Sequence, residues 1–430
     1  MGARIPAQLR EAIVTAATWQ QRYVTPPLGW SAILIGFAVP ISVAFDNLLL
    51  AILLLGFLFN ARAILDIATH HPAARAACLL FGMLALGMSY GATPLREATG
   101  ILGKYVDLIF IPLLVLLFAD DTARRRAQYA FLAAMGLTLL LSYLVGIGWL
   151  PVQKWMWFAS GPENPAIFHS HITQNNMMAF AVFLSLLRLR AATSLEAKAG
   201  WGLFALLGAI NVLFMVQGRT GYLIMMALLA WFAWSTLTPL MQRRGIALGW
   251  RHALALCLTL GLLAAAAYQL SSRLHDRVML VVTEYSAWQP NHGKDSSTGQ
   301  RLDFYYNTLQ IVQQQPLFGV GTGGFSAAFA QQVQGTEALP THNPHNEYLM
   351  IAAQTGVVGL ALLLYLFYVL WRIAPRLPSP FEQDAARGLV LAYLVNCSLN
   401  SALLDHSDGL FFAFMTAVLF ANLKPEAKRD

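Results

Sequence analysis

The chain has 430 residues, of which 57% are apolar and 11% are charged, and its formal net charge is +7. A soluble domain usually carries about a quarter charged residues, so this composition excludes an ordinary soluble enzyme. The positive charge does not indicate a nucleic-acid partner, because the lysines and arginines are scattered between apolar segments and form no basic stripe. The three cysteines lie inside apolar runs and form neither a disulfide framework nor a metal-binding motif.

Apolar runs recur from one end of the chain to the other, and about 20 such residues cross a bilayer as a helix. They predict an all-α polytopic membrane protein with about twelve transmembrane helices. Residues 1–27 precede these helices, and we expect them to form a cytoplasmic amphipathic segment along the membrane surface. The predicted spans lie at 28–45, 47–61, 75–91, 100–118, 127–148, 171–189, 200–216, 219–237, 252–270, 346–371, 386–403 and 409–423.

The lysines and arginines predict the orientation of these spans, because such residues are enriched in cytoplasmic loops. All but eight of the 28 fall on the side that holds both ends of the chain, so we expect both termini, including the tail 424–430, to be cytoplasmic. Each of the other eight could bind an anion at the outer surface or simply be a loop cation that faces out. These eight are Arg96, Lys104, Lys154, Arg219, Arg273, Arg277, Lys294 and Arg301.

Residues 271–345 form a long polar segment on the outer side, between spans one to nine (28–270) and spans ten to twelve (346–423). Long segments of this kind are often functional, and its ordered features predict a folded cap of short helices. It holds three arginines. Arg273 and Arg277 are four residues apart and would share a helical face, where a bound anion would relieve their repulsion; Arg301 lies further along.

Within the cap, the pattern Ser297-x-x-Gln300 predicts the start of a helix that ends before Pro316. Its expected apolar face consists of Leu302, Tyr305, Tyr306, Leu309 and Val312. A glycine-rich stretch follows, with Gly319, Gly321, Gly323 and Gly324. This stretch lacks both the Lys-Ser/Thr pair of a phosphate-binding loop and a preceding strand, so it predicts a tight turn between helices.

The sequence Gln217-Gly218-Arg219-Thr220-Gly221 falls at the outer turn between spans seven and eight. The guanidinium of Arg219 can donate to two phosphate oxygens at once, and the adjacent helix start favours an anion. Flanking glycines let backbone N–H groups approach such a ligand. The alternative is an interfacial arginine bonded to the last carbonyls of a helix.

The segment 341–347 places two imidazoles and a carboxylate at the start of span ten. His342 and His345 are candidates for a general base, because the unperturbed pKa of histidine lies near neutrality. The alternative is structural: Asn343 or Asn346 opens the helix as its cap, and the histidines are interfacial polar residues.

Polar side chains also gather at the entry to span six: His169, His171, Gln174, Asn175 and Asn176. Polar amides inside a membrane helix cost free energy unless they are paired. They therefore line either a helix contact or a substrate groove, and the sequence leaves both open. A metal site that combines His169 and His171 with the two imidazoles of span ten is a weaker alternative, because few outer carboxylates and no outer cysteine complete it.

Two of these motifs resemble the O-antigen ligase family. One is Arg219-Thr220-Gly221. The other joins His345-Asn346 to Gly356 and Gly359 inside the next helix, and this spacing is specific.

A third stretch looks like the loop signature that ligases share with O-antigen polymerases and protein O-oligosaccharyltransferases: Arg301, then Pro316-Leu317-Phe318-Gly319-Val320-Gly321 and Phe325. The matches cover residues 217–221 and 301–359, and the twelve-span layout with its outer cap also agrees with the family.

The resemblance implies a GT-C-like integral glycosyltransferase of the bacterial inner membrane, inverting and independent of metals and other cofactors. Its donor would be O-antigen linked to undecaprenyl diphosphate, and its acceptor the core oligosaccharide of lipid A. By the motif match, Arg219 and Arg301 would contact the diphosphate on the periplasmic side and His345 would be the essential histidine. Arg273 and Arg277 have no motif anchor, and His342 is the bystander of the two imidazoles; His171, Gln174, Asn175 and Asn346 are candidates for a substrate groove.

Two relatives of a ligase remain as alternatives. A polymerase would use the same donor, and a protein O-oligosaccharyltransferase would accept a hydroxyl on a secreted protein. A transporter of lipid-linked glycans is the alternative from another class, but it predicts internal repeats and ionisable residues deep in the membrane. Asp107 in span four is the main residue of that kind, and either a helix contact or pairing with Lys104 would explain it.

Overall fold

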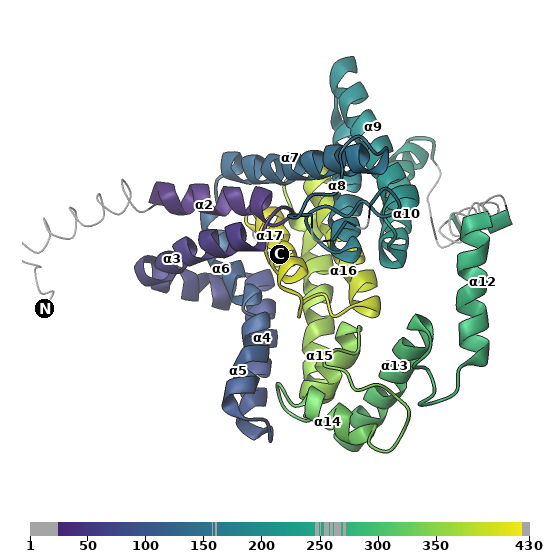
Figure 1. The fold of residues 1–430 in the computed structure, drawn as a ribbon. Coiled ribbons are helices and arrows are strands. Elements are labelled where there is room, and N and C mark those ends of the chain that lie inside the picture. The colour runs from purple at the N-terminus through teal and green to yellow at the C-terminus, as the bar shows by residue number, and fades with distance from the viewer. Residues whose placement is uncertain are drawn as a thin grey trace, which may run out of the picture.

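The computed structural model describes residues 25–423 except 157, 160, 246–248, 250, 253–257, 259–260, 262–267 and 270–271. These residues form helices joined by turns, without a strand among them (Figure 1). The first helices are α2 (Thr25–Ala38), α3 (Val43–His70), α4 (Pro72–Tyr90), α5 (Leu95–Lys104), α6 (Asp107–Leu117), α7 (Asp121–Gly146), α8 (His171–Ala191), α9 (Leu195–Ile210), the π-helix η2 (Asn211–Met215) and α10 (Arg219–Arg243). The later ones are α12 (Ser272–Ala287), α13 (Ser297–Gln314), α14 (Phe325–Gln332), α15 (Glu347–Ile373), the short η3 (Ala374–Arg376), α16 (Pro380–Leu399) and α17 (His406–Phe420).

Seven helical stretches in the described part are long and apolar enough to cross a membrane. They are α3, α4, α5 with α6, α7, α9 with η2, α10, and α15 with η3. The prediction of an all-helical, multi-span membrane protein is therefore confirmed, whereas the number twelve is not. Predicted span nine, the segment 1–27 and the tail 424–430 lie wholly or mostly outside the described residues.

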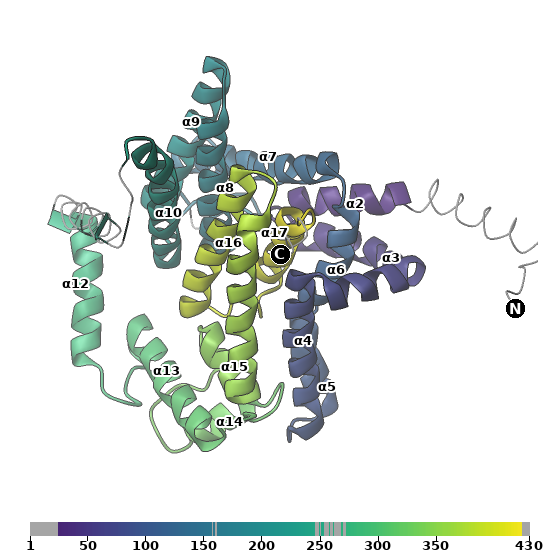
Figure 2. The same ribbon diagram turned by 180° about the vertical axis from the view of Figure 1, so that it is seen from behind.

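The other predicted spans correspond to helices that are short or rich in polar residues. The first and last correspond to α2 and α17, with 14 and 15 residues. Predicted spans six and eleven correspond to α8 and α16, whose polar residues lower their hydropathy. The physical reason is burial: α8 packs against α9, α10 and α16 (Figure 2), so its surface faces protein rather than lipid.

The interior is built around α17, a short helix whose side chains from Ser407 to Phe420 are all buried. Its Phe411 packs against the rings of Phe131, Phe180 and Tyr393. Aromatic side chains bury large areas, so this contact joins α7, α8 and α16 to the centre of the protein. A helix surrounded in this way does not need the length of a lipid-facing span.

The segment 272–345 contains α12, α13 and α14. Figure 1 shows α13 and α14 gathered beside the start of α15, while α12 stands apart from the other helices. The buried carboxylate of Asp303 in α13 folds the preceding turn onto this helix, because it accepts hydrogen bonds from Trp288 Nε1, Asn291 N and Gly293 N at 2.7–2.8 Å.

This turn explains two corrections to the predicted cap helix. The N-cap of α13 is Ser296, one residue before the predicted start, and its hydroxyl accepts a hydrogen bond from the amide of Gly299. The predicted apolar face is also wrong. The buried face consists of Gly299, Asp303, Phe304, Asn307, Thr308 and Ile311, since polar side chains there bond to the 288–293 turn, and Leu309 is 47% exposed.

The glycine-rich stretch forms the tight turn that the sequence predicts, with φ between 65° and 89° at Gly319, Gly321 and Gly323. The turn lies against a break in α15 at Gly356, where φ is 65° and ψ is −162°. Backbone groups that the break releases bond to the turn: Val320 N donates to Ala353 O, and Val357 N donates to Pro316 O. The motif glycines therefore serve the contact between the cap and α15.

Candidate functional site

His345 lies directly before α15 in a left-handed backbone conformation, with φ of 55°. Its amide donates to Asn343 Oδ1 at 2.8 Å, and its carbonyl accepts from the hydroxyl of Tyr305 at 3.3 Å. The ring stacks on Phe304 of α13, with centroids 6.1 Å apart. Among the described residues no hydrogen bond engages its ring nitrogens. The backbone is held while the imidazole stays available for a ligand.

Two arginines, one from α10 and one from α13, lie near the N-terminal end of α13. Arg219, the first residue of α10, is exposed, and its Nη1 lies 3.4 Å from Thr298 Oγ1. Arg301 is half-buried and donates from Nη1 to Leu399 O at 3.2 Å. Because Thr298 and Arg301 are three residues apart, both guanidinium groups face one end of one helix.

The positive charge of Arg301 acts on the groups around it. Burial lowers the pKa of the His345 imidazole from its ordinary 6.5, and the charge of Arg301 lowers it further. Burial also raises the pKa of Tyr305, so its hydroxyl stays protonated as a donor to the carbonyl of His345. The same guanidinium is close enough to His171 to act on that ring. The arrangement keeps His345 neutral near pH 7, in the form that accepts a proton.

A buried polar layer supports these residues. The carboxylate of Glu347 accepts from Tyr105 at 2.9 Å and from the amides of Leu403 and Leu404. Asn400, which follows α16, donates to the hydroxyl of Thr220 at 3.1 Å and thereby fixes the start of α10. The three motifs at 217–221, 301 and 345 are thus carried by helix ends that are tied to one another.

The structure places the candidate groove residues in different settings. Asn346 is the N-cap of α15, as the capping alternative expected: its Oδ1 accepts from Leu349 N and its Nδ2 donates to Ser398 O. His342 is exposed and bonds to Ser326 of α14 at 2.9 Å. His171 is half-buried near Arg301.

Gln174 and Asn175 are fully buried and bond within the protein. Gln174 Oε1 accepts from the amide of Ile167, and Asn175 Nδ2 donates to Val216 O at 3.1 Å. A Cβ atom at Gly218 or Gly221 would lie 2.6 or 2.5 Å from Asn175. The glycines of the 217–221 motif therefore allow α8 to approach the start of α10, which is the helix-contact alternative.

Arg273 and Arg277 both lie in α12, but their side chains are outside the described residues. Over the part of the chain that is described, no three side chains of His, Cys, Asp or Glu are grouped so that they could hold a metal ion.

Comparison with known proteins agrees with the motifs. Residues 203–364 match the sequence model of a family described as O-antigen ligase. This region is similar to the O-antigen ligase family. It contains Arg219, Arg301 and His345, so the resemblance predicted from the sequence is confirmed where the site lies. The chain is also 23% identical over 324 residues to an uncharacterized protein of Haemophilus influenzae, a match that covers 73% of this chain and 77% of the relative.

The structure shows three further residues that support His345, which the sequence alone did not single out for this role. Asn343 orients the backbone of His345, and its Oδ1 also accepts from Ser401 at 2.7 Å. Tyr305, expected on an apolar face, bonds to His345. Ser401 lies in the loop after α16, which ends at Leu399 although the predicted span extends to 403. In the sequence, the one feature that indicates this local backbone arrangement is the Asn343-Pro344 pair, which is typical of a turn.

Asp107 has a partner other than the predicted Lys104. Its Oδ2 lies 3.5 Å from Nδ1 of His406, and Nε2 of the same imidazole lies 3.0 Å from Oδ1 of Asp46. Both aspartates are buried. The contact joins α3, α6 and α17, so Asp107 takes part in a helix contact, the other explanation that the sequence allowed.

Proposed function

We propose that this membrane protein is an O-antigen ligase that transfers O-antigen polysaccharide from undecaprenyl diphosphate to the core oligosaccharide of lipid A. The observation that carries the proposal is the convergence of Arg301 and His345, with Arg219 at the same end of α13, inside the region similar to the O-antigen ligase family. In this proposal the site faces the periplasm, both termini are cytoplasmic, and the enzyme is an inverting GT-C glycosyltransferase of the inner membrane.

The donor diphosphate would bind to the two guanidinium groups. As the anomeric C–O bond breaks, its electron pair leaves with the diphosphate, and positive groups fixed in place stabilise this growing charge. Arg219 and Arg301 supply such charge from the protein itself. Arg273 and Arg277 in α12 are further candidates for the same donor.

The acceptor hydroxyl would be activated by His345. Its neutral ring accepts the hydroxyl proton as the oxygen bonds to the anomeric carbon on the face opposite the diphosphate, which inverts that centre. The lowered pKa of His345 favours this neutral form. Its left-handed backbone, together with a ring that makes no hydrogen bond among the described residues, is typical of a residue held for function.

The test is transfer by the purified full-length protein in liposomes, with undecaprenyl-diphosphate-linked glycan as donor and lipid A-core as acceptor. We expect a shift of the acceptor band on a gel, its loss in His345→Ala, and its retention in the matched variant His342→Ala. Arg219→Ala and Arg301→Ala should weaken donor use, whereas His345→Ala should abolish transfer and keep donor binding.

Other outcomes would favour the alternatives. Lengthening of the donor lipid without an acceptor shift would indicate a polymerase. Neither product from an active donor would favour a protein acceptor or transport of the lipid-linked glycan. Loss of activity in EDTA that Mg²⁺ or Zn²⁺ restores would contradict metal independence, and equal loss of donor binding in all three site variants would contradict the division of roles.

A further inference from the structure

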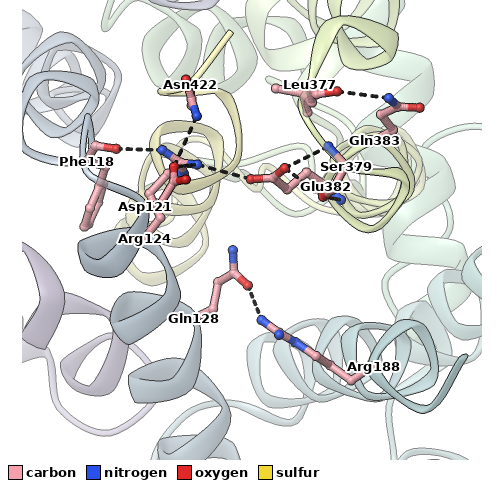
Figure 3. Close-up of polar contacts among 10 residues, drawn as sticks. All are labelled: Phe118, Asp121, Arg124, Gln128, Arg188, Leu377, Ser379, Glu382, Gln383 and Asn422. Carbon is pink, nitrogen blue, oxygen red and sulfur yellow. Dashed lines mark hydrogen bonds and ion pairs between the residues drawn. The ribbon is translucent and has the colours of Figure 1, made fainter. Parts of the chain in front are cut away.

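A polar cavity of about 380 Å³ lies between the first turns of α7, the last turns of α8 and the start of α16 (Figure 3). It lies beyond the C-terminal end of α15, whereas His345 precedes the other end, and 27 helical residues span about 40 Å. The cavity is thus separate from the proposed catalytic site. At about 30 Å³ per water molecule, it can hold an ion of phosphate size together with several waters.

The two carboxylates of this cavity, Asp121 and Glu382, both pair with Arg124. The buried Arg124 forms ion pairs with Asp121 and with Glu382, the latter at 3.3 Å. Glu382 also accepts from the amide and hydroxyl of Ser379, which closes the capping box of α16. Among the described residues, the other two arginines of the cavity, Arg125 and Arg188, have no directly bonded carboxylate, and the three arginines outnumber the two carboxylates.

Arg188 is a half-buried cation with neutral partners. It donates to Gln128 Oε1 at 2.7 Å and to the hydroxyl of Tyr129 at 3.5 Å, and it lies 4.4 Å over the ring of Phe381. Its Nε is buried and makes no hydrogen bond among the described residues. Arg125 lines the same cavity, and its charge acts on Arg188 in the opposite direction to that of Glu382. An anion between the two arginines would relieve this repulsion.

Gln128 adds a donor that points into the cavity. This side chain is 4% exposed, its Oε1 is occupied by Arg188, and no other bond of its amide nitrogen is present among the described residues. Figure 3 shows that nitrogen directed toward the space between the Arg124–Glu382 pair and Arg188. Helices α7 and α16 also begin at this cavity, and helix N-termini favour negative charge.

We propose that this cavity binds a phosphate-type oxyanion, and that the headgroup phosphodiester of an anionic lipid supplies it. Arg125, Arg188 and the amide of Gln128 would donate to its oxygens. The lipid source is favoured by the aromatic side chains next to Arg188, where Tyr129 contacts the guanidinium and stacks on Trp201. Aromatic side chains of this kind are typical of the membrane–water interface. The proposal rests on these contacts and does not depend on the reaction at His345.

The test is binding to the purified full-length protein by native mass spectrometry, with short-chain phosphatidylglycerol, phosphatidylcholine of the same chain length, and inorganic phosphate as probes. Gln128→Glu keeps an acceptor for Arg188 and adds a negative charge aimed into the cavity, so phosphatidylglycerol affinity should fall about tenfold. Arg125→Gln should lower it about fivefold, the typical contribution of one cation near a lipid headgroup. Arg126→Gln is the matched control, since Arg126 is the next residue, equally charged, and stacks on Trp30 outside the cavity.

Preferential retention of phosphatidylglycerol that falls in the two cavity variants and stays within twofold in the control supports a lipid site. Variant-sensitive binding of inorganic phosphate without lipid preference supports the oxyanion site and assigns it a soluble ligand. Equal binding of the two lipids with no binding of phosphate would overturn the proposal. Equal losses in all three variants would do the same, because they would indicate general surface attraction. Arg125 is exposed, so its variant decides the question even if Gln128→Glu does not fold.

Discussion

Asn343 holds His345 in its left-handed conformation through a hydrogen bond of 2.8 Å between Asn343 Oδ1 and the amide of His345. A residue with a side chain pays about 1–2 kcal/mol for this backbone conformation, so surrounding contacts must impose it. The same Oδ1 accepts from Ser401, which follows α16. The direction of the imidazole is therefore set jointly by the cap segment and the α16–α17 connection.

We predict that Asn343→Ala lowers kcat about 10- to 100-fold, because a displacement of a catalytic group by about 1 Å can cost this much. The KM for the donor should change less than threefold, since the arginines are untouched. Asn343→Asp keeps the acceptor oxygen and should recover most of the rate at pH 8, where His345 is neutral. Steady-state transfer kinetics measure both parameters. Equal defects in the two variants would show that the hydrogen bond does not position His345.

The pH dependence of transfer should report the charge of Arg301. The neutral imidazole is the active base, and burial together with Arg301 lowers the pKa of His345 below 6.5, so activity should persist below that pH. Arg301→Gln removes the cation, and the acid limb of kcat/KM should move to higher pH. Arg301 is the cation that lowers the pKa of His345, so Arg219→Gln should lower activity and leave the limb in place. Identical profiles for both variants would contradict this.

The same shift has a consequence for stability. Because the folded pKa of His345 is lower than the unfolded one, the unfolded chain binds more protons between the two values. The contribution of His345 is therefore fully present above about pH 6.5 and is lost as the pH falls from there through the folded pKa.

The sequence predicted the helical membrane architecture because apolar runs report lipid-facing helices directly. It also located α8 and α17 to within a few residues, but it treated them as lipid-facing spans, because their burial depends on neighbours distant in the sequence. The site shows the same division. Motif spacing predicted Arg219 and His345 as site residues, whereas the contacts of Ser401 and Asn343 join segments that only the fold brings together.

Gly356 permits the contact between α15 and the glycine-rich turn. Its φ and ψ of 65° and −162° are accessible almost only to glycine, and a Cβ would lie 2.2 Å from the carbonyl of Leu317. Gly356→Ala should cost about 3 kcal/mol or more of unfolding free energy. Gly82→Ala, in α4, has no atom within 4 Å of the added Cβ and serves as the control. Thermal unfolding in detergent compares the two, and similar midpoints would refute the steric argument.

His406 contacts two buried carboxylates at once, and its removal should be among the most damaging single changes outside the site. Asp46 and Asp107 are at most 1% exposed, and among the described residues Asp107 has no hydrogen-bond donor besides this imidazole contact. His406→Ala leaves two uncompensated acids at the junction of α3, α6 and α17, which should cost about 3–5 kcal/mol. By contrast, His342→Ala, at an exposed ring, should change stability by less than about 0.5 kcal/mol.

A double substitution separates this electrostatic cause from lost packing. Adding Asp107→Asn to His406→Ala removes one of the two buried charges and should recover part of the stability, whereas a cavity left by the imidazole would persist. The comparison requires unfolding midpoints of the single and double variants under one detergent condition. If the two substitutions instead add their costs, the imidazole acts through packing alone, and the buried pair of acids is accommodated without it.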